Sequence, residues 1–514
     1  MSRSLVAHKF VSVLFCCLCT EFAVAQEYFM NPVICGDVAD PTIIRWGDTY
    51  YAAGTSSEWA PHYPLYRSAD LVNWEQVGHI FQRMPDWTSS SFWAPELFVH
   101  RGKVYCYYTA RSRTTGRSYV GVAVADTPEG EYVDHGPLVD FGTEDIDAFV
   151  YNDDGQLYIT WKAYGLDPRP IELLCQPLSA DGLHLEGKAI PLMVDKENIG
   201  MEGQCIFRQD GWYYLLYSAR GCCGPRSDYE VRVARSRTLY APFEPYADNP
   251  ILKGSTDVLS IGHGTLVDTP DGRHYYLCHA YLRGAGFYRG RQPFLQELFV
   301  GSDEWPHFKT GRLACLRQPM PFAGTAQQPP ADFEDDFTGE TLDRAWTWNY
   351  TYCDVIAQLK GGSLLLSGTG KGASRGAALC LRPAATDYDF TTVLSSRTAE
   401  LTGLTFYGND DSHVILGRRG NRLQLVSRVA GNDSVWLDIP CRSRSLHLKG
   451  KVSEGCRLSF AYSDDGVTWK TVGSDAPDGS QVLSWDRISR PGLYTDAPSS
   501  HPARFDSFRM HLKP

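Results

Sequence analysis

The chain has 514 residues and a formal net charge of -11 at pH 7. This negative balance argues against nucleic acid and anionic membrane surfaces as partners, because both are negatively charged themselves. A charged fraction of 21% and a hydrophobic fraction of 43% are typical of a globular protein. The length exceeds what one hydrophobic core usually supports, so we expect two domains.

The first residues have the pattern of a secretory signal peptide. Arg3 and Lys9 form a basic start, residues 10–18 are apolar, and Ala23-Val24-Ala25 supplies the small residues of a cleavage site. The apolar run is too short to span a bilayer as a helix. We therefore predict a signal peptide at residues 1–25, cleavage near Ala25, and export to the periplasm or the medium without a membrane span.

A short turn motif then occurs five times. Each copy is a glycine followed closely by tyrosine and other strand-forming residues, and the five copies begin at Gly47, Gly102, Gly155, Gly211 and Gly272. The steps between them are 55, 53, 56 and 61 residues. A period of about 40–60 residues with several short strands per unit is typical of a β-propeller. The sequence thus predicts an all-β fold that begins with a five-bladed propeller at residues 26–318.

A second segment precedes each of these turns. In a propeller it would begin the innermost strand of its blade, so the five segments would meet around the central axis. They are Ala39-Asp40-Pro41, Trp93-Ala94-Pro95-Glu96, Ile146-Asp147-Ala148, Met201-Glu202-Gly203 and Gly262-His263-Gly264. We expect Asp40, Asp147 and Glu202, from blades one, three and four, to share one pocket.

Three carboxylates in one pocket suit glycoside hydrolysis. That reaction needs a carboxylic acid to protonate the leaving oxygen and a second carboxylate, which in inverting enzymes activates water at a separation of roughly 6.5–9.5 Å. A third carboxylate nearby raises the pKa of the acid by like-charge repulsion and keeps it protonated near neutral pH. Taken singly, each carboxylate is more often structural than catalytic: an Asp before Pro, as at Asp40, is common in turns, and Asp147 could cap one. The prediction therefore depends on their shared place in the repeat.

The pattern changes after the fifth repeat. Residues 319–334 are rich in proline and lack periodicity, as linkers do. Short strands separated by Asn, Asp and Gly turns follow in residues 335–514, which predicts a β-sandwich (jelly-roll) domain. The twelve cysteines after residue 25 show no disulfide framework. Because neighbours in sequence rarely bond to each other, we expect Cys222 and Cys223 to be free thiols like the others.

The axis segments, taken together with Asn31-Pro32 and Asp40-Pro41-Thr42, resemble the blade motifs of glycoside hydrolase family 43 over residues 30–318. Asp335-Asp336-Phe337 together with Leu342-Asp343-Arg344-Ala345-Trp346 resemble the opening of the concanavalin-like sandwich often attached to family members. The resemblance implies a five-bladed propeller and a hydrolysis reaction that inverts the anomeric configuration of the released sugar. Members include β-xylosidases, α-L-arabinofuranosidases, endo-arabinanases and galactosidases.

The resemblance also implies roles for single residues. Asp40 corresponds to the general base, Glu202 to the general acid, and Asp147 to the carboxylate that adjusts the pKa of the acid and orients it. Arg291 corresponds to an arginine that contacts the sugar. His263 corresponds to a histidine near the propeller axis that in many members faces a bound calcium ion through water; a purely structural histidine is the alternative. The chemistry itself needs no cofactor.

Two tryptophans are further candidates for substrate binding. Trp93 and Trp59 carry indole rings, on which the C–H face of a sugar packs well. Packing within a blade is the alternative for both. Trp93 lies in an axis segment, which makes it the better candidate.

We therefore predict an exported, inverting exo-glycoside hydrolase. It would release terminal α-L-arabinofuranose or β-D-xylose from plant cell-wall polysaccharides. An endo-arabinanase or a galactosidase of the same family is an alternative, since the sequence does not reveal the shape of the groove. A non-catalytic carbohydrate-binding propeller is an alternative of another class, and it would be expected to lack at least one of the three carboxylates.

Overall fold

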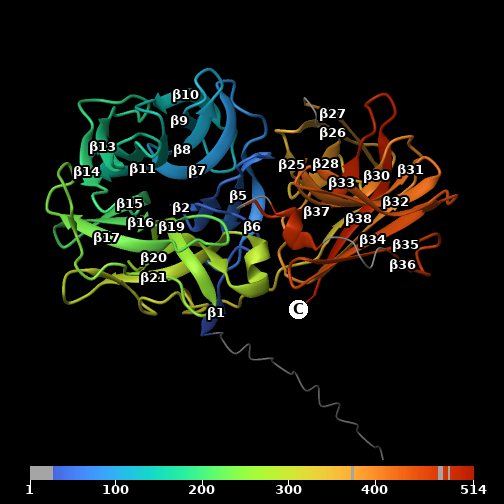
Figure 1. The fold of residues 1–514 in the computed structure, drawn as a ribbon. Coiled ribbons are helices and arrows are strands. Elements are labelled where there is room, and N and C mark those ends of the chain that lie inside the picture. Colours follow the sequence, from blue (N-terminus) through green and yellow to red (C-terminus); the bar gives the residue numbers. More distant parts are fainter. Residues whose placement is uncertain (1–26, 372–375, 473–477, 484–486, 514) are drawn as a thin grey trace, which may run out of the picture.

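The computed structural model describes residues 27–371, 376–472, 478–483 and 487–513. The predicted signal peptide lies outside the described residues. Apart from two short 3₁₀ helices, η1 (Gly284–Arg289) and η2 (Gly479–Val482), the regular elements of these ranges are strands, which confirms the predicted all-β class. They form two domains side by side, the propeller in blue to yellow and the sandwich in orange to red (Figure 1). None of the helices in these ranges is long and apolar enough to cross a membrane.

The first domain consists of five four-stranded antiparallel sheets. In chain order, the blades are β2 (Thr42–Trp46), β3 (Thr49–Ala53), β5 (His62–Ser68) and β6 (Glu75–Phe81); β7 (Thr88–His100), β8 (Lys103–Ser112), β9 (Ser118–Ala125) and β10 (Val133–Val139); β11 (Asp145–Asp153), β12 (Gln156–Ala163), β13 (Glu172–Leu178) and β14 (Ile190–Val194); β15 (Met201–Gln209), β16 (Trp212–Ala219), β17 (Glu230–Ser236) and β18 (Glu244–Pro245); β19 (Val258–Asp268), β20 (His274–Leu282), β21 (Gln292–Val300) and β22 (Pro306–Phe308).

The five repeated glycines lie in the turns between the first two strands of the blades. Their φ angles run from 62° at Gly47 to 102° at Gly155, a left-handed region that glycine enters without steric cost. The repeat was therefore visible in the sequence because every blade begins with the same tight hairpin.

The propeller closes into a ring. Its innermost strands contact one another in the order β2, β7, β11, β15, β19 and again β2. The two ends of the domain also pair, as β1 (Tyr28–Met30) with β23 (Arg317–Pro319). The side chain of Asn31 joins the first and last blades: it donates to Leu295 O at 3.0 Å and accepts from Leu295 N–H at 2.9 Å. The propeller thus extends to Pro319, at the start of the predicted linker.

The second domain is a sandwich of two sheets. One sheet contains β24 (Phe333–Asp335), β26 (Cys353–Leu359), β27 (Leu364–Gly370), β29 (Tyr388–Leu394), β34 (Leu446–Ser453), β35 (Arg457–Ser463), β36 (Lys470–Val472) and β38 (Ala503–Leu512). The other contains β28 (Ala377–Cys380), β30 (Thr402–Asn409), β31 (Ser412–Arg419), β32 (Arg422–Val429), β33 (Asn432–Pro440) and β37 (Arg490–Thr495). Phe390, Leu404, Leu448 and Phe505 are fully buried in the core. The sandwich begins at Phe333, inside the predicted linker of residues 319–334.

The two domains share a small sheet. Strand β4 (Trp59–Ala60) of the propeller pairs with β25 (Trp348–Asn349) of the sandwich, and Arg487 forms an ion pair of 2.7 Å with Glu58. The Trp59 side chain is enclosed here. Only 3% of Trp59 is exposed, the guanidinium of Arg490 lies 3.9 Å from its ring centroid, and Tyr407 packs edge-on against it.

This position corrects the expectation that Trp59 is a sugar platform. A stacking platform must present one ring face to the ligand, whereas the indole of Trp59 is covered by residues of the sandwich domain. Its partners lie hundreds of positions later in the chain, so no local pattern could have revealed them.

Candidate active site

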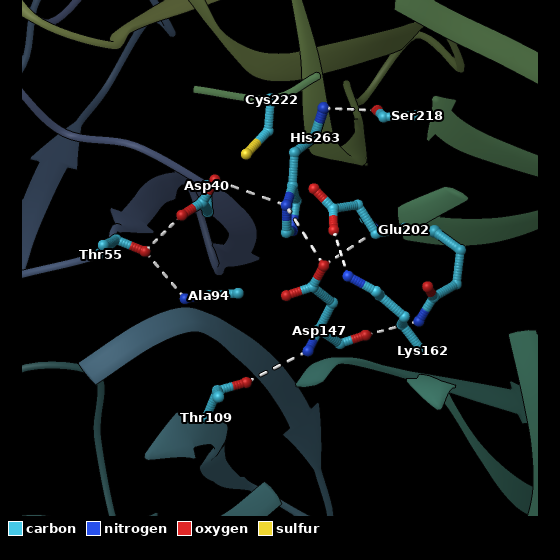
Figure 2. Close-up of polar contacts among 12 residues, drawn as sticks. Asp40, Thr55, Ala94, Thr109, Asp147, Lys162, Glu202, Ser218, Cys222 and His263 are labelled. Atoms are coloured by element: carbon cyan, nitrogen blue, oxygen red, sulfur yellow. Dashed lines mark hydrogen bonds and ion pairs between the residues drawn. The ribbon is translucent and has the colours of Figure 1, made fainter. Parts of the chain in front are cut away.

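The predicted axis residues meet at the centre of the propeller. Asp40 lies two residues before the start of β2, Asp147 lies in β11, Glu202 in β15 and His263 in β19. Figure 2 shows Asp40 and Glu202 on opposite sides of His263 and Asp147. The His263 Nδ1 atom is 3.5 Å from Asp40 Oδ1 and 3.8 Å from Asp147 Oδ2. The structure therefore gathers all three predicted carboxylates and the predicted histidine.

Local backbone irregularities direct these side chains toward the axis. The register of the innermost pairing shifts after Ile146, after Glu202 and after Gly262. Asp40, Asp147 and His263 have φ angles of 50°, 59° and 46°, a region that residues other than glycine rarely occupy. Bulges of this kind change the direction of a side chain, and they are common beside active sites.

Asp40 is a buried carboxylate surrounded by positive and donor groups. Its Oδ2 accepts a hydrogen bond of 2.6 Å from Thr55 Oγ1, and its Oδ1 lies 3.3 Å from Arg291 Nη1. Burial raises the pKa of Asp40, but the charge of Arg291, followed by His263 and His279, outweighs it and holds the pKa well below the usual value. Asp40 is therefore ionised at neutral pH, as a base that activates water must be.

Further hydrogen bonds hold Thr55 and the backbone of Asp40 in place. Ala94 N–H donates to Thr55 Oγ1 at 2.8 Å, which fixes the hydroxyl that in turn donates to Asp40 (Figure 2). The backbone N–H of Asp40 donates to His279 Nδ1 at 3.0 Å. Burial lowers the pKa of His279 to about 4, so this ring is neutral near pH 7. Trp93, the residue before Ala94, is partly exposed. Its location next to this network keeps it a candidate for sugar contact.

Glu202 has donors on both carboxylate oxygens. Lys162 Nζ donates to Oε2 at 2.8 Å, and Tyr229 OH donates to Oε1 at 3.0 Å. Burial raises the pKa of Glu202, but the ammonium group of Lys162 more than compensates and lowers it. The sequence-based expectation was a raised pKa on this acid. It is wrong for the free protein, because it did not include Lys162.

The raised pKa belongs to Asp147 instead. Burial is the main cause that raises the pKa of Asp147, and the negative charges of Glu202 and Asp40 add to it. The positive charges of His263 and Lys162 oppose this rise but do not cancel it, and the pKa of Asp147 reaches about 7. Because Asp147 and Glu202 interact strongly, the proton that is lost near neutral pH belongs to the pair. The predicted like-charge repulsion is therefore present, but in the free protein it favours protonation of Asp147.

Asp147 is also tied to the strand that carries Glu202. Gly203 N–H donates to Asp147 Oδ2 at 3.2 Å, and Gln204 Nε2 donates to Asp147 O at 2.5 Å. On its other side, Asp147 N–H donates to Thr109 Oγ1 at 3.1 Å. These bonds fix the position of Asp147 relative to β15, a geometry that suits a residue that orients Glu202.

His263 packs tightly in this centre. Its backbone N–H donates to Ser218 Oγ at 2.7 Å. A Cβ at position 203 would lie 2.6 Å from its ring, so Gly203 makes room for the imidazole. Within the described ranges, no group of three or more His, Cys, Asp or Glu side chains is arranged to hold a metal ion. The expectation of calcium near His263 thus gains no support from the side chains around it.

Arg291 lies beside Asp40 and beside a disulfide. Its Nη1 is 3.6 Å from Cys223 Sγ, and its backbone N–H donates to Asp37 Oδ1 at 3.0 Å. Cys222 and Cys223 are bonded to each other, which corrects the expectation of free thiols at these two positions. The ten other cysteines of the described chain are free, as expected. In Figure 2, the Cys222 side chain points toward the side of the site on which Asp40 lies.

Comparison with known proteins agrees with this geometry. The model of the glycosyl hydrolases family 43 matches residues 29–306, more than half of the chain. The chain belongs to glycosyl hydrolase family 43. A second model, that of the beta xylosidase C-terminal concanavalin A-like domain, matches residues 334–511. The predicted family and both predicted domain types are thereby confirmed, and the protein is a glycoside hydrolase.

Several relatives of this family 43 chain are named as xylosidases or arabinofuranosidases. It is 27% identical to a xylan 1,3-beta-xylosidase of Vibrio sp, over 86% of this chain and 90% of the relative. It is 29% identical to a non-reducing end alpha-L-arabinofuranosidase of Bacteroides ovatus, over 68% and 66%. A xylan beta-1,4-xylosidase of Bacillus halodurans has the same fold, with a TM-score of 0.79, 23% identity, and coverage of 94% of this chain and 100% of that one.

Several residues at this family 43 site were not predicted from the sequence. Thr55 and His279 show no distinguishing local pattern. Lys162 does have one: it is a charged residue between Trp161 and Ala163 in the second half of β12, where every residue is buried. A lysine in such a strand is rarely buried without a charged partner, so its position already pointed to a carboxylate nearby.

The role of Asp147 can be tested through pH dependence. Asp147→Asn removes the carboxyl group that shares a proton with Glu202, and with it the negative charge that this group gains near neutral pH. The pKa of Glu202 should therefore fall, and the basic limb of the kcat/KM profile should move to lower pH. We expect a larger effect on kcat than on KM. The measurement is a pH–rate series for both enzymes, with Asp154→Asn on the exposed turn of the same blade as the control. An unmoved basic limb would show that Asp147 is only structural.

Proposed function

We propose that this family 43 enzyme is an exported, inverting exo-glycoside hydrolase that releases terminal pentoses from plant cell-wall polysaccharides. The observation that carries the proposal is the pairing of an ionised Asp40 with Glu202 across one centre (Figure 2). Inverting hydrolysis needs a base for water on one face of the sugar and an acid for the leaving oxygen on the other. Export depends on the predicted signal peptide at residues 1–25.

The reaction follows from these positions. Asp40 takes a proton from a water molecule as that water attacks the anomeric carbon. The bond from this carbon to the leaving oxygen breaks on the opposite face, and Glu202, in its protonated form, donates a proton to that oxygen. The released sugar then has the opposite anomeric configuration. Arg291, held between Asp40 and Cys223, is placed to contact a hydroxyl of the sugar next to the base.

The choice of sugar rests on the relatives. Their names include both xylosidases and arabinofuranosidases, and the two pentoses present hydroxyls at similar positions. We favour α-L-arabinofuranose over β-D-xylose, because the loop containing Cys222 and Cys223 resembles that of arabinan-active members. Exo action is supported by the sandwich domain, which packs on residues 58–60 of the propeller, only a few residues after Thr55 in the chain.

A panel of nitrophenyl glycosides tests this proposal. We expect the highest kcat/KM on the α-L-arabinofuranoside, lower activity on the β-D-xyloside, and little on hexosides. Arabino- and xylo-oligosaccharides should lose single sugars from one end, and chromatography of the early products would show this. Release of mixed internal fragments would indicate an endo-arabinanase, preference for galactosides would indicate a galactosidase, and binding without turnover would indicate a non-catalytic propeller.

A further inference from the structure

A buried ion-pair triad lies behind the acid. Lys162 Nζ is 2.8 Å from Glu202 Oε2 and 3.5 Å from Glu144 Oε2. The three side chains, from Lys162, Glu202 and Glu144, are only 11%, 18% and 12% exposed. At such burial, charged groups persist only when paired. Lys162 is thus shared between the proposed acid and a second carboxylate that no catalytic step uses.

The chain is shaped to hold this triad. Lys162 lies in β12 opposite Ile146 of β11, next to Asp147, and Glu144 directly precedes that strand. Gly165 follows β12, and a Cβ there would lie 1.8 Å from Glu144 Oε2 and 3.0 Å from Lys162 Cε. Any other residue at position 165 would displace the Glu144 carboxylate. The absence of a side chain at this position therefore leaves the space that the second carboxylate occupies.

We propose that Lys162 and Glu144 are positioning residues of the general acid. Lys162 holds Glu202 Oε2 and stabilises the carboxylate that is left after proton donation. Glu144 competes for Lys162, so that Glu202 can be protonated again. This inference rests on the proposed role of Glu202. Lys162 contacts no substrate atom in this scheme and acts only through Glu202. The balance between the positive charge of Lys162 and the negative charge of Glu144 would then set the pKa of Glu202.

Other charged and titratable groups also face Glu202. Lys162, Tyr229, His263 and Asp147 interact with it directly. Glu144 is linked to it through Lys162, and Asp40 through Asp147 and His263. Among these, Lys162 is the largest influence that lowers the pKa of Glu202. Loss of its charge should therefore raise the pKa of the acid. Loss of the Glu144 charge should lower it, because Lys162 would then pair with Glu202 alone.

The two variants should move the pH profile in opposite directions. Lys162→Met should shift the basic limb of kcat/KM to higher pH, by about 1–3 units for the loss of an opposite charge at this distance. Glu144→Gln should shift it to lower pH. Lys162→Met should also lose more activity on natural oligosaccharides than on aryl glycosides, because a weaker acid assists a poor leaving group less.

Two control variants separate the loss of the Lys162 charge from other effects of the substitution. Lys162→Arg retains the charge and should keep the basic limb near that of the unchanged enzyme. Lys103→Met removes an exposed lysine that pairs with Asp126 on the surface, and it should leave the profile unmoved. Thermal unfolding of each variant identifies any that fails to fold. If Lys162→Met does not fold, the other two variants still test the proposal. Glu144→Gln should shift the basic limb to lower pH, and Lys162→Arg should leave it unchanged.

Failure of this inference differs from failure of the proposed function. Glu202→Gln is measured in the same series. If Glu202→Gln shows the loss expected of an acid while the basic limb stays fixed in both Lys162→Met and Glu144→Gln, the triad is merely structural and the inference is overturned. Shifts in the same direction for the two variants would also overturn it. If Glu202→Gln shows no loss, the proposed function itself is wrong.

Discussion

Glu202→Gln should slow the hydrolysis of natural oligosaccharides by roughly 10²–10⁴-fold, the usual value of a general acid. Activated aryl glycosides should lose clearly less. The amide keeps the shape of the side chain but has no proton to donate to the leaving oxygen. A sugar alkoxide depends strongly on that proton, whereas a nitrophenolate leaves without much help. Steady-state kcat/KM on an oligosaccharide and on the matching nitrophenyl pentoside measures the difference.

A surface glutamate supplies the control for this variant. Glu197 is largely exposed, 3.9 Å from Arg232, and Glu197→Gln should leave both rates unchanged. If Glu202→Gln lost the same factor on both substrates, the leaving group would not be receiving its proton from Glu202. The role of acid would then have to be assigned to another residue.

Asp40→Asn should reduce both rates strongly, by roughly 10²–10⁴-fold each. Water must be activated whatever the leaving group is, so the loss should not depend on the substrate. In the unchanged enzyme, the pKa of Asp40 is well below its usual value, so the base should stay ionised until the pH falls below about 4, the ordinary value for aspartate. Kinetics on the same two substrates check the substrate independence.

Asp48→Asn is the matched control on the same blade. Asp48 is fully exposed in the turn after β2, and its loss should not alter either rate. If Asp40→Asn and Glu202→Gln showed the same dependence on leaving group, the assignment of base and acid would be contradicted even though the fold is correct.

The propeller could be predicted because its signals are local. Gly47 and its four equivalents mark hairpin turns that need positive φ, and each turn follows an axis segment at a nearly constant distance. The positions of Asp40, Asp147 and Glu202 follow from that repeat. The sandwich could be predicted as a change of pattern, although its first strand begins at Phe333 within the supposed linker.

The remaining features depend on contacts between distant parts of the chain. Trp59 is covered by Tyr407 and Arg490 of the other domain, so its local sequence misled. The pKa of Glu202 is lowered rather than raised, because Lys162 of the preceding blade donates a hydrogen bond to its carboxylate. Burial strengthens such a pair, and the sequence gives no measure of which charges a fold buries together.

The anomeric configuration of the first product tests the paired roles of Asp40 and Glu202 most directly. Proton NMR during hydrolysis of an aryl α-L-arabinofuranoside or β-D-xyloside distinguishes the two anomers before mutarotation mixes them. A base that delivers water opposite the leaving group predicts that the β-arabinose or the α-xylose anomer, respectively, appears first. Initial release of the anomer with the configuration of the substrate would require a covalent intermediate and would contradict the assignment of Asp40 as a base for water.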